Sequence, residues 1–347
     1  MEKMKEFDRA AQRRAQEKWD RVAKPLNSLG KLEKMIAKIA GIQGTDDIAL
    51  SPRCALVFCA DHGVVEEGVT QSPASVTAQV ARSIAEGGAN INLMAAGTDV
   101  FAVDMGMEKR IVCPGLIDRR VMDGTDNMAK GPAMTRAHAL QALRAGEDLI
   151  GEMKARGYRM AATGEMGIGN TTAASAVACV LLDLPAEKMT GRGAGLSDEG
   201  LKRKISAIER AIALNRPDKN DALDVLAKVG GLEIAAMAGA FIGGRKWGVP
   251  VVIDGVISAV AALCAERICP GTADFMLASH VSREPAGRLL LDELGLEGVL
   301  HADMALGEGT GAVLLFPILE AAARVYMGEH TFESIGVAQY TPQEDKK

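Results

Sequence analysis

The chain has 347 residues, of which 48% are hydrophobic and only 3% aromatic, and its formal net charge is −5. General nucleic-acid binding needs a basic face, so this charge balance argues against it and leaves small molecules as the expected partners. Glycine and charged residues interrupt every apolar run before it reaches membrane-spanning length, and the charged segment 1–21 has no signal-peptide character. We therefore expect a cytoplasmic protein with no membrane partner.

The six cysteines include no Cys-x-x-Cys pair, and most of them lie within apolar runs. This placement is typical of buried free thiols in a reducing compartment rather than of disulfides or zinc ligands. We therefore expect neither a disulfide framework nor a bound metal.

Helices and strands are predicted along the chain from the period of its apolar residues. Two helices without a strand partner come first, over 1–23 and 31–43. Strands are expected over 54–60, 100–105, 158–162, 249–253 and 275–278. Further helices are expected over 75–85, 135–156, 173–182, 198–213, 222–228, 232–247, 257–269, 287–294 and 312–326. This alternation predicts an α/β protein with one parallel sheet covered by helices on both faces, and the terminal helices form a smaller unit.

The glycine-rich segment 164–172 (GEMGIGNTT) lies between an apolar strand and a helix of small residues. A strand, a glycine turn and a helix together direct backbone N–H groups at an anion, and the glycines let the backbone approach a phosphate. Asn170 and Thr171 add side-chain donors or a helix cap. Glu165 does not suit a phosphate cradle, which indicates a site that also handles a proton or a hydroxyl. The alternative is a plain turn whose glycines serve packing.

Three other polar clusters follow apolar strands or open helices: Asp61-His62, 191–195 (GRGAG) and 308–311 (EGTG). Ligands gather at the carboxyl ends of strands in open α/β sheets, so the clusters predict one pocket lined by glycine turns. Glu308 lies between two glycines near the start of a helix, where we expect it to be ionised yet poorly solvated, as a general base needs to be. The alternative for Glu308 is a carboxylate that stabilises the start of that helix.

Two weaker groups of candidates remain open. Lys204 follows the second glycine turn and either contacts a phosphate or lies on a solvated helix face. Asp61, His62 and His280 are possible metal ligands, but too few other ligands lie nearby in motif spacing, which favours capping or substrate contact.

Six stretches give the chain a resemblance to a known family. They are KPLNSLGKLE at 24–33, CADHGV at 59–64, GEMGIGNTT at 164–172, KVGGLEIAAMAGA at 228–240, PVVIDG at 250–255 and LGEGTGA at 306–312. With these residues in order over nearly its whole length, the chain resembles the nicotinate-nucleotide–dimethylbenzimidazole phosphoribosyltransferases, which make the lower-ligand nucleotide of cobamides.

The resemblance implies a Rossmann-like sheet domain over 46–312 and a small helical domain built from 1–45 and 313–347. It implies transfer of the phosphoribosyl group from nicotinate mononucleotide to an aromatic base, without a cofactor, by a homodimer or by a heterodimer with a paralogue. The family's general base falls on Glu308, and its other active-site carboxylate falls on Glu165. Residues implied in substrate binding are Ser72, Gln79, Gly167, Gly169, Asn170, Thr171, Gly191, Gly193, Lys204 and Asp254.

One position departs from the family pattern. The family often has a glutamine one position after Gln79, where this chain has Val80. Gln79 substitutes for that glutamine only if the helix is rotated or slipped, so the departure bears on which ring is accepted. Two rival functions are a non-catalytic or partner-dependent nucleotide-binding subunit and a metal-dependent hydrolase that uses Asp61, His62 and His280.

Overall fold

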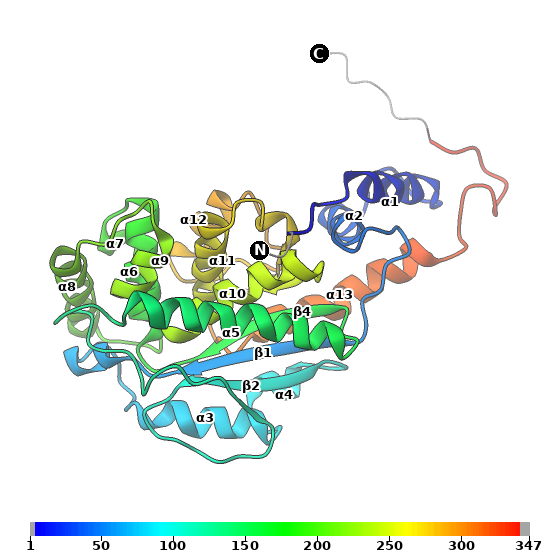
Figure 1. Ribbon diagram of the computed structural model, residues 1–347. Helices are drawn as coiled ribbons and strands as arrows, with labels where there is room; N and C mark the ends of the chain where they lie inside the picture. The colour runs from blue at the N-terminus through cyan, green and yellow to red at the C-terminus, as the bar shows by residue number, and fades with distance from the viewer. Residues whose placement is uncertain (1–3, 341–347) are drawn as a thin grey trace.

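The computed structural model describes residues 4–340, and within them six strands form one parallel sheet (Figure 1). The strands lie in the order β3 (Leu116–Asp118), β2 (Asp99–Gly106), β1 (Arg53–Ala60), β4 (Met160–Met166), β5 (Val251–Ile253) and β6 (Met276–Ala278). The chain reverses its direction of winding between β1 and β4, and this is where doubly wound sheets bind ligands, outside the carboxyl ends of the strands. The predicted Rossmann-like α/β class is confirmed.

Helices cover both faces of the sheet, and the side chains of β1 alternate between two cores. Leu56 and Phe58 contribute to one core, whereas Ala55 and Val57 contribute to the other. The first face is covered by α5 (Arg136–Ala155), α10 (Leu232–Trp247) and α11 (Val256–Ile268), with α6 (Asn170–Leu182), α7 (Ala186–Met189), α8 (Asp198–Asn215), α9 (Ala222–Val229) and α12 (Ala286–Glu293) adding to that layer. The second face is covered by α3 (Ser75–Ala85), α4 (Asn90–Met94) and α13 (Thr310–Met327). Short 3-10 helices lie at Gly63–Glu67 (η1) and Ala273–Phe275 (η2).

The two ends of the chain meet in a small helical unit. Helices α1 (Arg9–Arg21) and α2 (Lys31–Gln43) pack on each other, and α2 also packs on α13. The rings of Trp19 and Tyr326 lie 5.1 Å apart, and the Tyr326 hydroxyl donates to the Asp46 carbonyl at 2.7 Å. The core of this unit is continuous with the second face of the sheet. The domain boundaries at 45 and 312 stay predictions, and the second of them falls inside α13.

Three predicted helices, over 31–43, 75–85 and 232–247, match α2, α3 and α10 to the residue. The first helix begins only at Arg9, because the Asp8 side chain accepts hydrogen bonds from the backbone of Ala10 and Ala11 and so caps it there. Residues 1–3 of the predicted helix lie outside the described residues. The short helices α4 and α7 have no counterpart in the sequence prediction.

Strand β4 is longer than predicted, and this changes the environment of a site residue. It runs to Met166 rather than ending at residue 162, because Gly164 and Glu165 pair with Val57 and Phe58 of β1. Glu165 therefore lies in the sheet, not in the glycine turn where the sequence placed it.

One helix departs from the expectation that no segment would be long and apolar enough to cross a membrane. By length and composition alone, α13 passes that test, but 56% of it is buried within the fold. It is the core helix that joins the sheet to the terminal unit. The six cysteines are free, and all except Cys269 are buried, as predicted.

Helices α5 and α10 approach each other unusually closely at two glycines. A Cβ atom added at Gly146 would lie 1.8 Å from the carbonyl oxygen of Ala236, and one added at Gly239 would lie 1.7 Å from that of Leu143. Backbone touches backbone at both points, so no side-chain movement could make room. The helix pair that supports β1, β2 and β4 therefore depends on these glycines.

We expect Gly239→Ala to lower the free energy of unfolding by about 1–3 kcal/mol, because the helices must separate to admit the methyl group. This decrease is the net change that remains after the ~1 kcal/mol by which alanine favours a helix over glycine. Urea denaturation measures it. The control is Gly131→Ala, because a Cβ there meets no atom within 4 Å. Equal stability of Gly239→Ala and wild type would contradict the packing described.

Candidate functional site

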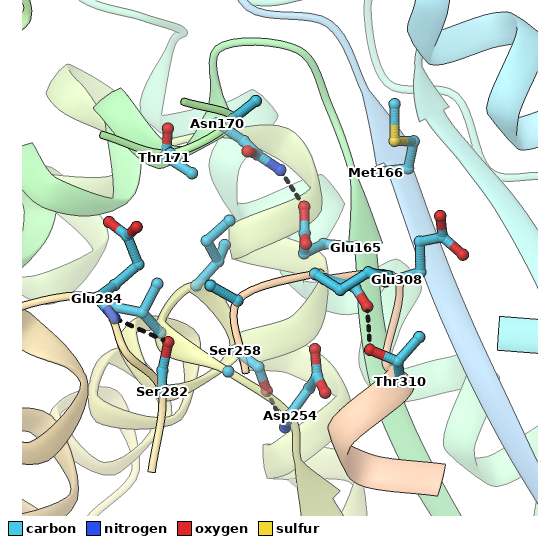
Figure 2. Close-up of a pocket in the computed structure, with 18 of the residues that line it drawn as sticks. Glu165, Met166, Asn170, Thr171, Asp254, Ser258, Ser282, Glu284, Glu308 and Thr310 are labelled. Atoms are coloured by element: carbon cyan, nitrogen blue, oxygen red, sulfur yellow. Dashed lines mark hydrogen bonds between the residues drawn. The ribbon is translucent and has the colours of Figure 1, made fainter. Parts of the chain in front are cut away.

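A cavity of about 280 Å³ lies outside the carboxyl ends of β4, β5 and β6 (Figure 2). Its walls come from the end of β4, the turn into α6, the second glycine turn, the segments after β5 and β6, and the turn into α13. The predicted site residues that line it are Glu165, Gly167, Asn170, Thr171, Gly193, Asp254 and Glu308. Three of the four predicted clusters are thus gathered in one cavity, whereas Asp61 and His62 do not line it.

Glu165 is buried at the end of β4 and carries a strongly shifted pKa. Asn170 donates to one carboxylate oxygen, and the backbone N–H of Glu308 donates to the same carboxylate. Burial raises the pKa of Glu165 to about 8, and the nearby carboxylates of Asp254 and Glu233 add to the rise. Near neutral pH the ligand-free site therefore holds a proton on Glu165.

Glu308 lies in a left-handed turn that packs directly on β4. Its φ is +63°, between Gly307 at +87° and Gly309 at +92°, an unusual conformation for a residue with a side chain. A Cβ at Gly164 would lie 2.3 Å from the Glu308 carbonyl oxygen, so only glycine in β4 admits this turn.

The Glu308 side chain is half-buried and points away from Glu165, toward the start of α4 (Figure 2). Its two oxygens accept hydrogen bonds from the Asn90 side chain at 3.2 Å and from the Ile91 backbone N–H at 3.0 Å. The carboxylate is thus held at the cavity wall by a short helix that the sequence did not reveal.

Asp254, which follows β5, is buried beside the start of α13. One of its oxygens accepts a hydrogen bond from the Ala312 backbone N–H at 3.0 Å, and further N–H groups of the same turn face it. Burial raises the pKa of Asp254 to about 6, although these N–H groups oppose the rise. Asp254 therefore anchors the helix that follows Glu308, in addition to lining the cavity.

Lys204 of α8 is fully buried behind the cavity wall, not on a solvated face. Its ammonium group donates to the Thr171 hydroxyl at 2.8 Å and to the Gly191 carbonyl at 3.1 Å, and so joins the two glycine turns. Burial lowers the pKa of Lys204 to about 8, while the Glu284 carboxylate favours its charged form.

Five predicted residues do not line the main cavity: Ser72, Gln79, Gly169, Gly191 and Lys204. Gly169 borders a smaller cavity of about 70 Å³ on the other side of the same turn. Gln79 is exposed, whereas Val80 lines the main cavity, because successive helix residues point about 100° apart. Helix α3 is thus not rotated in the way that would let Gln79 replace the family's glutamine.

The glycines of the first turn mainly allow close contact within the protein. A Cβ at Gly167 would lie 2.4 Å from the Ala60 carbonyl oxygen, and one at Gly169 would lie 2.9 Å from a Val65 methyl. Gly167 thus packs tightly on the end of β1 and Gly169 on η1, while their predicted approach to a phosphate stays a prediction. Helix α6 nevertheless starts at this turn without a side-chain cap.

Asp61 and His62 are buried beneath the turn and do not form part of the cavity wall. His62 pairs instead with Glu233. His62 Nε2 lies 2.8 Å from Glu233 Oε1 of α10, and both side chains are buried. Burial lowers the pKa of His62, but the charges of Glu233, Asp61 and Glu165 together outweigh it and raise that pKa. His280 instead lines the main cavity next to Ser279. Among residues 4–340, Asp61, His62 and His280 do not converge as metal ligands would.

Sequence reasoning missed several residues that line or hold the site. Ser282 and Glu284 follow β6 at the ligand-binding edge of the sheet. Because ligands gather at the carboxyl ends of strands, their position after a predicted strand could have identified them. Asn90 carries no such signal, because α4 is too short to show a helical period.

A doubly wound parallel sheet with a glycine-lined cavity at its carboxyl edge defines a class of α/β enzymes that bind nucleotides. Within that class, residues 4–337 match a family model described as phosphoribosyltransferase, and the chain belongs to this family.

Named relatives agree with that assignment. The chain is 48% identical over 330 residues to the nicotinate-nucleotide–dimethylbenzimidazole phosphoribosyltransferase of Acetivibrio thermocellus, covering 94% of each. It is 43% identical to the protein of the same name from Ruminiclostridium cellulolyticum, over 98% of this chain and 97% of that one. The crystal structure of CobT from Thermus thermophilus matches with a TM-score of 0.90 at 43% identity, over 95% of this chain and 100% of that chain. The resemblance seen in the sequence is confirmed.

We expect Glu165 to make stability depend on pH. An ordinary glutamate titrates near 4.5 and folded Glu165 near 8, so between these values the folded protein keeps a proton that the unfolded chain has lost. Stability therefore falls as the pH rises through this window. Relative to Glu165→Gln, the free energy of unfolding of the wild type should fall by on the order of 4 kcal/mol from about pH 5 to about pH 8.

Chemical denaturation at several pH values measures this difference. Glu187→Gln is the matched control, because Glu187 is exposed and its replacement should leave the wild-type pH dependence unchanged. Parallel stability curves for wild type and Glu165→Gln would contradict the proton assigned to Glu165.

Proposed function

We propose that the chain transfers the 5-phosphoribosyl group from nicotinate mononucleotide to an aromatic lower-ligand base, releasing nicotinate and giving an α-riboside 5′-phosphate for cobamide biosynthesis. The observation that carries this is the meeting of Glu165 and Glu308 with both glycine turns in one cavity. The named relatives support the choice of substrates.

The phosphate of the nucleotide binds at the start of α6, close to Thr171 and Gly193. Helix α6 has no side-chain cap, whereas carboxylates already occupy the starts of α13 and α4. The N–H groups of Asn170 and Thr172 donate to the backbone carbonyls of Gly167 and Gly169, and the positive end of the helix dipole favours an anion there. The buried Lys204 adds positive charge directly behind Thr171.

The acceptor ring binds at the opposite end, between Val80 and Glu308. Both residues line the cavity, together with the apolar side chains of Met166 and Leu306. An aromatic ring suits these apolar walls, and its acidic hydrogen then faces the Glu308 carboxylate.

The chemistry needs one proton acceptor and one stabilising charge. A bond forms between the acceptor's ring nitrogen or hydroxyl oxygen and C1′, the bond from C1′ to the pyridinium nitrogen breaks, and the acceptor's proton passes to Glu308. Nicotinate leaves as a neutral ring nitrogen with the bonding electron pair. In-line attack inverts the β-nucleotide to the α-product.

Glu165 stabilises the positive charge that develops at C1′. The ligand-free site keeps it protonated, but a cationic pyridinium nucleotide favours the ionised carboxylate. Glu165 thus releases its proton to solvent when the substrate binds and carries a negative charge at the moment of transfer.

We also infer a homodimer and a cytoplasmic location. The buried free thiols suit a reducing compartment. A chain that acts only as a partner-dependent subunit would bind nicotinate mononucleotide but release no nicotinate alone. An assay of the single purified chain therefore distinguishes the two functions.

Glu308→Gln should leave nucleotide binding intact and lower kcat by at least about 100-fold, as expected for loss of a general base. Calorimetry measures the binding, and nicotinate release at saturating substrates measures kcat. Glutamine keeps an oxygen that can accept from Ile91, so the start of α4 should stay in place. Near-normal turnover of Glu308→Gln, or loss of stability alone, would contradict the catalytic role.

Dimethylbenzimidazole, adenine, phenol and p-cresol should all serve as acceptors. Val80 offers no hydrogen-bonding group to the ring, so this side of the cavity does not select for acceptors with a ring nitrogen. Product analysis with each acceptor tests the range, and Val80→Gln should narrow it. Exclusive use of dimethylbenzimidazole by the wild type would contradict the broad acceptor pocket.

A further inference from the structure

Four carboxylates line the cavity, and one of them is free to bind a ligand. Glu165, Asp254 and Glu308 each accept hydrogen bonds from the protein. The Glu284 carboxylate accepts none from any residue between 4 and 340. Only its backbone N–H is used, in a bond to the Ser282 hydroxyl at 3.3 Å. Its two side-chain oxygens therefore remain available to a molecule in the cavity.

The Glu284 carboxylate lies against the second glycine turn. A Cβ at Gly191 would lie 1.8 Å from Glu284 Oε2, so glycine at 191 makes room for the carboxylate. The carbonyl of the same glycine accepts from Lys204 at 3.1 Å. In Figure 2 the Glu284 carboxylate points toward the strip of chain that carries Thr171. It thus lies next to the end of the cavity assigned to the phosphate.

A carboxylate in this place suits the sugar rather than either end of the nucleotide. It would repel a phosphate placed directly on it, so the phosphate stays on the α6 side. The aromatic acceptor lies at the far end, between Val80 and Glu308. The pentose lies between these two ends, and carboxylates bind its hydroxyl groups through strong, charge-assisted hydrogen bonds.

We propose, resting on the proposed function, that Glu284 accepts hydrogen bonds from the 2′ and 3′ hydroxyls of the ribose and makes the enzyme select ribosyl over deoxyribosyl nucleotides. Glu284 contacts the substrate but exchanges no proton with it.

The test compares kcat/KM for nicotinate mononucleotide and its 2′-deoxy analogue, in the wild type, Glu284→Gln and Glu284→Ala. Each variant should lose at least about 10-fold with the ribonucleotide and less with the deoxy analogue, which keeps only the 3′ hydroxyl. The different intrinsic reactivity of the two sugars cancels, because only the change in selectivity is compared. Glu199→Gln is the matched control, since Glu199 is exposed on α8 near the same glycine turn and should leave selectivity unchanged.

An equal loss with both nucleotides in both variants would overturn the assignment, because it would make Glu284 a purely structural residue. Nicotinate release by the wild type tests the proposed function separately. If the wild type releases none, calorimetric affinities for the two nucleotides still decide the question. Unchanged discrimination in Glu284→Gln and Glu284→Ala would overturn the proposal, whereas its loss in both would support it.

Discussion

The site depends on the contact between the main chain of Glu308 and Gly164 of β4. The Glu308 carbonyl lies where any side chain at position 164 would stand, and the Glu308 N–H donates to Glu165 of the same strand. One short turn is thereby tied to the sheet at two points. Because the Glu308 backbone contacts β4, the Glu308 side chain extends away from β4, toward α4. The two carboxylates therefore point in different directions from a common anchor.

The N-termini of helices stabilise the charges of the carboxylates around the cavity. Asp254 and Glu308 take the N–H groups at the starts of α13 and α4, and Glu233 lies in the first turn of α10. Each pairing offsets part of the cost of burying a carboxylate. Among residues 4–340, no carboxylate takes the N–H groups at the start of α6. An acidic protein can in this way present a positive site to an anionic nucleotide.

The sequence was enough to predict the layered α/β fold and most element boundaries to within about three residues, because apolar strands and amphipathic helices leave regular patterns. It also predicted that Glu165, Asn170, Thr171 and Glu308 would meet, since all follow strands or open helices at one sheet edge. It failed where an outcome depends on contacts between distant segments. That Glu165 belongs to β4 follows from its pairing beside Phe58, and the burial of Lys204 follows from the packing of α8.

The same limit explains the glycines of the first turn. A glycine-rich motif looks alike whether it faces a ligand or another backbone, and here Gly164 and Gly167 face backbone. The failure to notice Glu284 has a different cause. The segment after β6 has no glycine motif, so only the position of the strand end could have drawn attention to it.

Helix α13 connects two distant parts of the molecule, with Pro317 inside it. It spans roughly 27 Å at 1.5 Å per residue. Its first turn follows Glu308 and is capped by Asp254, and its last turn holds Tyr326 against Trp19 of the terminal unit. The terminal helical unit thus supports, through α13, the turn that carries Glu308.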